Sequence, residues 1–254
     1  MCCFSRPVRS VTDTRIFARA GDDGREFLVY SMSFSAKQDL AMILPLPVPP
    51  GSGERAVDFI NLKDYPDFFD DLHRGFPVPP PAEAPGDRSV APASAALPKL
   101  QVIQVGDFEA SFVPTVKDFG RLDPRFRLPS GTWAKLPQYR SYGFAVFKLK
   151  QGAMRVHPMA FSFPRHKLAE LFFPTVHIHD GKVHERARFD HTLYCQPHNN
   201  DYPNFGGQWD ESATQASGFM KVPDAKGLIE PDQHCYRRQL HGQLANRDTV
   251  LRIG

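Results

Sequence analysis

Proline is the residue that most restricts what this chain can form. There are 24 prolines among the 254 residues, and they are spread from Pro7 to Pro231. A proline inside a helix removes a backbone hydrogen bond and clashes with the preceding turn, so the prolines point away from a helical bundle and favour strands joined by loops. Hydrophobic residues make up 41% of the chain and aromatic residues 12%, which is enough for a packed core.

Alternation of apolar and polar residues predicts where the strands lie. Residues 14–20 and 25–34 alternate on either side of the turn sequence GDDG, and further hairpins are expected over 100–113 and 142–163. Residues 40–44 are apolar without alternation, which is typical of a strand covered on both faces. A short helix is expected over 65–76. The sequence therefore predicts a mostly β (α+β) fold, an antiparallel sheet or sandwich built from hairpins.

The domain organisation expected for residues 1–254 is a single domain, since β-rich folds commonly keep such a length in one unit. The segment from Pro77 to Pro98 is rich in proline and alanine and has almost nothing to bury. We expect it to be an extended or mobile insertion.

Charge and patterning restrict the partners and the compartment. The formal net charge is only +3 and the basic residues are scattered, so nucleic acid is not expected as a partner. No apolar stretch approaches the roughly 20 residues that cross a bilayer, and the start MCCFSRPVRS lacks an apolar signal region. We therefore expect a cytoplasmic protein whose four cysteines stay reduced.

Three histidines surround an Asp-Gly pair, which is a strong signal for a two-residue hairpin turn. With Asp180 and Gly181 in the turn, His177 would pair with His184, and both would share one strand face with His179. Imidazoles in this arrangement can converge on one ion, so the sequence predicts a transition-metal site. Copper or zinc is favoured, with iron as a further option. The alternative without a metal is that the three histidines form the solvated face of an amphipathic hairpin.

Further residues rank lower as ligands. They are Cys2, Cys3, His191, Cys195 and His198. Strand alternation past Glu185 places His191 and Cys195 on the apolar side, where a buried pair is the simpler interpretation. The leading hypothesis is thus a metal-binding protein, leaning towards a metalloenzyme with a small-molecule or peptide substrate.

Two other functions are consistent with the sequence. Removal of Met1 would leave Cys2 with a free α-amine, the arrangement of N-terminal nucleophile amidohydrolases. A non-catalytic binding module that uses its sheet and loops as an interaction surface is the third hypothesis. Near the C-terminus, Arg237 and Arg238 lie in the expected strand 234–242 and could make it an anion-facing edge.

Several segments resemble a bacterial domain-of-unknown-function family. They are CCFSRPV, TRIFAR, AMILPLPVPP, YGFAVFKLK and HPMAFSFP followed by FFPTVHIHDG, in the same order over most of residues 1–180. Exported members of that family begin Cys-Gly-Gly-Phe-Phe-Cys and carry a Trp-Val-Leu-Pro-Val-Pro strand, whereas this chain lacks a signal peptide. The resemblance implies a β-rich fold and an important N-terminal cysteine, and it implies no activity.

Overall fold

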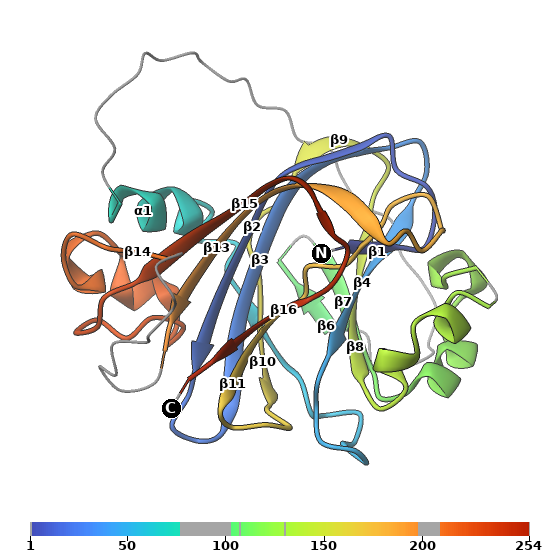
Figure 1. The fold of residues 1–254 in the computed structure, drawn as a ribbon, viewed down its shortest axis with the longest axis horizontal. Helices are drawn as coiled ribbons and strands as arrows, with labels where there is room; N and C mark the ends of the chain where they lie inside the picture. Colours follow the sequence, from blue (N-terminus) through green and yellow to red (C-terminus); the bar gives the residue numbers. More distant parts are fainter. Residues whose placement is uncertain (1, 77–102, 107, 130, 198–208, 254) are drawn as a thin grey trace.

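The computed structural model describes residues 2–76, 103–106, 108–129, 131–197 and 209–253. The predicted insertion from Pro77 to Pro98 lies outside these residues. Strands dominate the described chain, arranged in two large sheets and one small sheet with a few short helices around them (Figure 1). The predicted mostly β fold class is confirmed.

The first large sheet has six strands in the order β12-β1-β4-β8-β7-β6. Their bounds are β1 Cys2–Phe4, β4 Leu40–Leu46, β6 Ile103–Val105, β7 Phe108–Val113, β8 Gly143–Leu149 and β12 His177–Ile178. Every residue of β4 is buried, as its unbroken apolar sequence predicts, and β4 lies between β1 and β8.

The second large sheet has the order β14-β15-β13-β2-β3-β10-β5, and β9 also pairs with β3. Its strands are β2 Ser10–Ala20, β3 Arg25–Ala36, β5 Asp58–Asn61, β9 Gly152–Arg155, β10 Met159–Pro164, β13 Arg186–Gln196, β14 Asp210–Glu211 and β15 Tyr236–Ala245. A third, two-stranded sheet joins β11 Glu170–Phe173 to β16 Thr249–Arg252.

The predicted hairpins have different outcomes. β2 and β3 pair antiparallel around Gly24, whose φ of +77° suits a residue without Cβ. The hairpin expected over 142–163 is wrong, because β8 pairs with β4 and β7 while β9 and β10 pair with β3 in the other sheet. Alternation identifies strands correctly here, but the strand that buries each apolar face lies far away in the sequence.

The main core lies between the two large sheets. Phe4, Met42 and Phe147 from the six-stranded sheet belong to the same buried cluster as Tyr30 and Phe161 from the eight-stranded sheet. Short helices cover the outer faces: the α-helix α1 Phe68–Arg74, and the 3-10 helices η1 Val116–Arg121, η2 Pro124–Phe126, η3 Trp133–Lys135, η4 Pro137–Tyr139, η5 Ala216–Gly218 and η6 Val222–Ala225. Figure 1 shows α1 beside the eight-stranded sheet and η1 to η4 beside the other.

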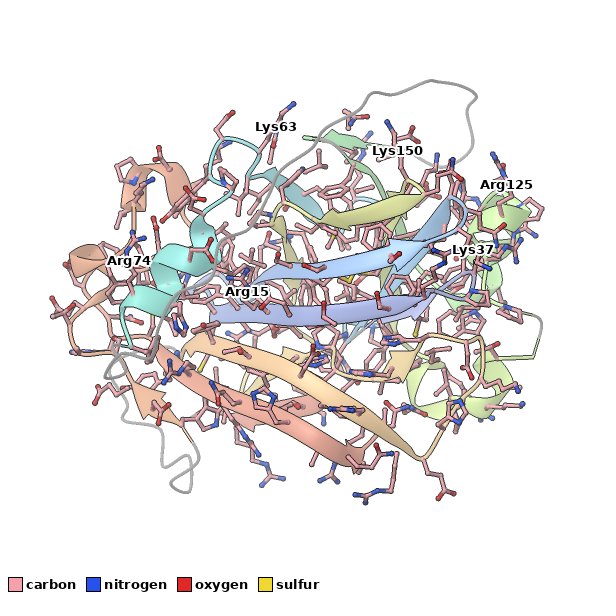
Figure 2. The ribbon with its side chains drawn as sticks, turned by 90° about the horizontal axis from the view of Figure 1, so that it is seen from above. Arg15, Lys37, Lys63, Arg74, Arg125 and Lys150 are labelled. Carbon is pink, nitrogen blue, oxygen red and sulfur yellow. The ribbon has the colours of Figure 1, made fainter. Side chains whose placement is uncertain are left out.

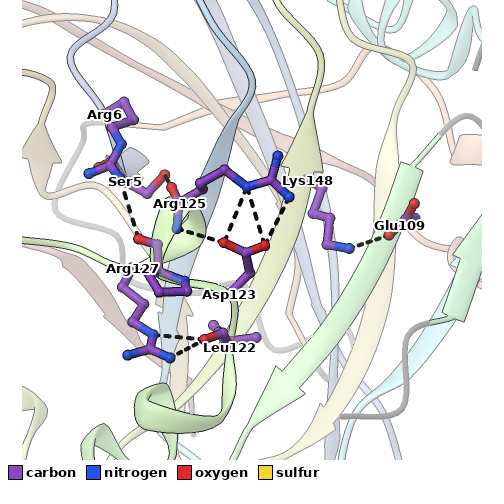
Figure 3. Close-up of polar contacts among 9 residues, drawn as sticks. Ser5, Arg6, Glu109, Leu122, Asp123, Arg125, Arg127 and Lys148 are labelled. Atoms are coloured by element: carbon purple, nitrogen blue, oxygen red, sulfur yellow. Dashed lines mark hydrogen bonds and ion pairs between the residues drawn. The ribbon is translucent and has the colours of Figure 1, made fainter. Parts of the chain in front are cut away.

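The segment after β1 is fixed to the six-stranded sheet by Ser5 (Figure 3). The Ser5 hydroxyl donates to the carbonyl of Arg125 at 2.9 Å and accepts from the amide of Ala41 at 2.9 Å. Ser5 is 1% exposed, so water has little access to replace these bonds.

We expect Ser5→Ala to lower the free energy of unfolding by about 2 kcal/mol, because a buried amide and a carbonyl each lose a partner. Urea denaturation of the full chain measures this loss. Ser52→Ala, which removes one hydroxyl from a partly exposed turn, is the matched control. Equal effects of the two substitutions would contradict the assignment of Ser5 as an anchor.

Candidate functional site

The three histidines predicted to line a hairpin do not form one. His177 and Ile178 form β12, which pairs in parallel with Cys2 and Cys3 of β1. The expected partner strand is absent among the described residues 182–185, where Lys182 instead donates its amide to the Asp180 carboxylate at 3.0 Å. Pairing with β1 buries Ile178 completely, which a surface hairpin would not do.

The predicted transition-metal site of His177, His179 and His184 is therefore wrong. His184 turns outward with its side chain 54% exposed, and its Nε2 contacts the Asp180 carboxylate at 2.9 Å. In the part of the chain that the structure describes, no group of three or more His, Cys, Asp or Glu side chains is arranged to hold a metal ion. This geometry contradicts the predicted copper or zinc function and, with it, the metalloenzyme hypothesis.

A different histidine cluster replaces it. The His177 ring stacks against both His179 and His191, with ring centroids 4.8 Å apart in each pair. The Nε2 atoms of His177 and His191 lie 3.2 Å apart, so one of them donates its proton and the other accepts. Phe189 closes the group, its ring centroid 4.4 Å from that of His177.

Burial keeps these imidazoles neutral. It lowers the pKa of His177 to about 2 and that of His179 to about 4, with the positive charge of the amino terminus acting in the same direction. The pKa of His191, which is 1% exposed, is lowered well below its usual value for the same reason. The cluster is a packed, uncharged group. Through it β12 contacts β13, and Phe4 of β1 contacts the ring of His179.

The lower-ranked candidates for metal ligands do not form one group in the structure. Cys3 and Cys195 are buried in different hydrophobic clusters, and burial raises the pKa of Cys195 well above its usual value, so it is no thiolate ligand. His191 and Cys195 are both buried, as strand alternation predicts. The backbone of Cys2 pairs with His177, and its role as a nucleophile stays a prediction. His198 lies outside the described residues.

A pocket of about 470 Å³ lies beside the histidine cluster, between β13, β15 and β16. Apolar side chains form much of its wall, and polar and charged groups complete it. The lining residues are Phe189, Arg238, Leu240, Leu244, Ala245, Arg247, Asp248, Thr249 and Val250. Val250 is 48% exposed, so apolar surface extends from the pocket to the outside of the molecule.

Arg238 is the unusual residue in this wall. It follows Tyr236 and precedes Leu240 on the face of β15 that contacts the main core. Burial lowers its pKa, yet it forms no ion pair or hydrogen bond with any residue that the structure describes. A partly buried charge without a partner costs free energy, and such groups are commonly found where a ligand supplies the partner.

Several other partly buried arginines have acidic partners, and Arg127 and Arg165 donate to backbone carbonyls instead. Arg15 contacts Asp70 at 2.7 Å beside α1 (Figure 2), and Arg19 contacts Glu230 at 2.6 Å. Even at the surface, the guanidinium of Arg125 donates to both carboxylate oxygens of Asp123 (Figure 3). Arg238 differs from these residues, because its guanidinium has neither an acidic nor a carbonyl partner within the described residues.

The charged residues in the wall besides Arg238 are one arginine and one aspartate. Arg247 lines the same pocket, and Arg252 follows Val250 on the same face of β16; neither forms an ion pair within the described residues. The one carboxylate in the wall belongs to Asp248, and it is engaged elsewhere. Asp248 accepts from the amides of Thr175 and Val176 at 2.8 and 3.1 Å and from the hydroxyl of Tyr139 at 2.5 Å.

Sequence reasoning found part of this site. An anion-facing edge at Arg237 and Arg238 is one option that the sequence leaves open, but Arg237 points to the opposite face and pairs with Asp210 at 3.0 Å. The signal for Arg238 is an arginine at a position where alternation calls for an apolar residue. The contribution of β16 could not be foreseen, because β16 pairs with β11 about 80 residues away in the chain.

No helix in the described residues is long and apolar enough to cross a membrane. No family model matches the sequence.

Solved structures of baculovirus P35 are similar to this chain. The crystal structure of P35 has 15% sequence identity and a TM-score of 0.46, covering 97% of each chain. P35 in a complex with caspase-8 has 14% identity and a TM-score of 0.48, covering 95% of this chain and 96% of that one. A mutated P35 after caspase cleavage has 13% identity and a TM-score of 0.48, covering 96% and 98%. Such distant likenesses carry nothing about what this chain binds or does.

Proposed function

We propose that this protein is a binding protein and that the pocket between β15 and β16 holds an acidic, partly apolar group of its partner. The observation that carries the proposal is the guanidinium of Arg238, which has no ion pair within the described residues and lies in a wall that combines apolar with polar groups. A carboxylate placed there would accept charge-assisted hydrogen bonds, which are stronger than bonds between neutral groups.

The apolar part of the ligand follows from the rest of the lining. Phe189, Leu240 and Leu244 present hydrocarbon surface around the guanidinium, and Val250 extends it outward. Burying apolar ligand surface there contributes about 25 cal/mol per Å². A purely ionic ligand would leave this surface wet, and a purely apolar one would leave Arg238 unpaired.

Arg238→Met is expected to weaken ligand binding while leaving the fold as stable as the natural chain or more stable. The reason is that the substitution removes a charge that has no described partner and keeps the hydrocarbon volume. Such an exchange of stability for function is typical of binding sites. Anilinonaphthalene sulfonate is a suitable probe, because it combines an aromatic body with one anionic group.

The measurement is a fluorescence titration of this dye together with urea denaturation. We expect saturable binding to the natural chain and at least about tenfold weaker binding to Arg238→Met, equivalent to about 1.4 kcal/mol. Arg9→Met, at an exposed arginine outside the pocket, is the matched control and should bind as the natural chain does. Unchanged dye binding by Arg238→Met, or equal losses in both variants, would disprove the proposal.

A further inference from the structure

We infer that the natural occupant of this pocket is an extended acidic peptide segment of a partner protein, which lies along the outer edge of β15. This inference rests on the proposed function and adds the class of ligand and its conformation. Three observations carry it: the unpaired edge of β15, the length of the pocket along that strand, and the alternation of its side chains.

The edge of β15 is open over most of its length. On one side β15 pairs with β13 from Tyr236 to Ala245, and on the other β14 pairs only with Tyr236 and Arg237. From Arg238 onward, no strand in the described residues pairs with this edge, and the carbonyl of Gln243 is the one backbone group there that accepts from a described side chain, the guanidinium of Arg186. Such an edge is a template on which an extended chain can form backbone hydrogen bonds.

The pocket is elongated along β15. Its lining residues on this strand run from Arg238 to Leu244 and on to Ala245, which at about 3.3 Å per residue corresponds to roughly 20 Å between the first two. A compact ligand that reaches Arg238 would leave the apolar surface at Leu244 exposed. An extended segment of about seven residues covers both ends.

The residues of β15 that face the ligand occupy alternate positions of the strand. Arg238, Leu240 and Leu244 share one face of β15, and Gly242 occupies the position between the two leucines. A Cβ placed on Gly242 would meet no atom within 4 Å, so there is open space above this residue. The complementary segment therefore has an acidic residue beside Arg238, an apolar one beside Leu240, a large aromatic one beside Gly242 and another apolar one beside Leu244.

The test uses the full chain and two synthetic peptides with blocked ends and a fluorophore at one end. In both, Glu, Val, Phe and Val alternate with Thr, in this order in one peptide and in the reverse order in the other, so that both strand directions are covered. Fluorescence polarisation should show saturable binding. A peptide with Gln in place of Glu should bind at least about tenfold more weakly, because it pairs less well with the guanidinium of Arg238. Against Arg238→Met, the Glu and Gln peptides should bind equally.

N-methylation of alternate amides tests the backbone contact. One set of amides faces β15 and the other faces solvent, so methylating the first set should abolish binding while methylating the second should leave it within about threefold. Equal effects of the two sets, or equal binding of the Glu and Gln peptides, would overturn the inference. Arg238-dependent binding of the dye without binding of any peptide would refute the peptide occupant and leave the proposed function standing.

Discussion

Asp248→Ala is expected to lower the free energy of unfolding by about 3 to 5 kcal/mol, since burial of the carboxylate, which raises its pKa, reduces the net contribution of each of its three hydrogen bonds to about 1 to 1.5 kcal/mol. The Asp248 carboxylate accepts three hydrogen bonds, from the amides of Thr175 and Val176 and from the hydroxyl of Tyr139. These donors lie in the strand connection before β12 and in η4, so one side chain joins three segments. Alanine would leave all three donors without an acceptor.

Urea denaturation distinguishes this role from a general effect of losing an acid. Asp248→Asn keeps one carbonyl oxygen and should lose about half as much stability as Asp248→Ala. Asp232→Ala, which removes an exposed carboxylate from a turn, should change stability by less than about 0.5 kcal/mol. Similar losses for Asp232→Ala and Asp248→Ala would show that the carboxylate of Asp248 does not hold these segments together.

The histidine cluster is expected to make the fold labile to acid. In the folded chain the pKa of His177 is lowered to about 2 and that of His179 to about 4 by burial, and the pKa of His191 is lowered well below its usual value. In the unfolded chain all three take protons near about pH 6.5. The unfolded state therefore binds more protons in acid, and stability falls as the pH drops.

The direction of these pKa shifts determines the pH range in which stability is lost. The contribution of each histidine is fully present above about pH 6.5 and is lost progressively as the pH falls towards its folded pKa. For His179 the loss amounts to about 2 to 3 kcal/mol by about pH 4.5, at about 1.4 kcal/mol per pKa unit. Glu26 acts in the opposite direction, because burial raises its pKa and its protonated form is favoured in the fold.

One variant separates the contribution of the histidines to the pH dependence of stability from that of the carboxylates. The difference in unfolding free energy between about pH 7 and about pH 4.5 should be smaller in His179→Gln than in the natural chain, because one titrating group is gone. His166→Gln removes an exposed histidine and should retain the natural difference. An unchanged pH dependence in His179→Gln would show that this imidazole is not held neutral in the fold.

Local sequence patterns determined the strands of this protein and little of their pairing. Alternation was sufficient to place β2, β3 and β15, and an unbroken apolar run ended by prolines placed β4, because each strand shows its buried faces in its own residues. The same alternation placed His191 and Cys195 in the interior. These properties depend only on which side chains leave water, and the sequence contains that information.

The tertiary structure alone decided where the sites lie. The Asp-Gly signal predicts a hairpin, but the burial of Ile178 against β1 outweighs a two-residue turn, so His184 is separated from His177. The pocket forms because β16 pairs with β11 and thereby comes to lie beside Arg238. Such contacts between segments far apart in the chain depend on the free energy of the whole core, which no local pattern of residues records.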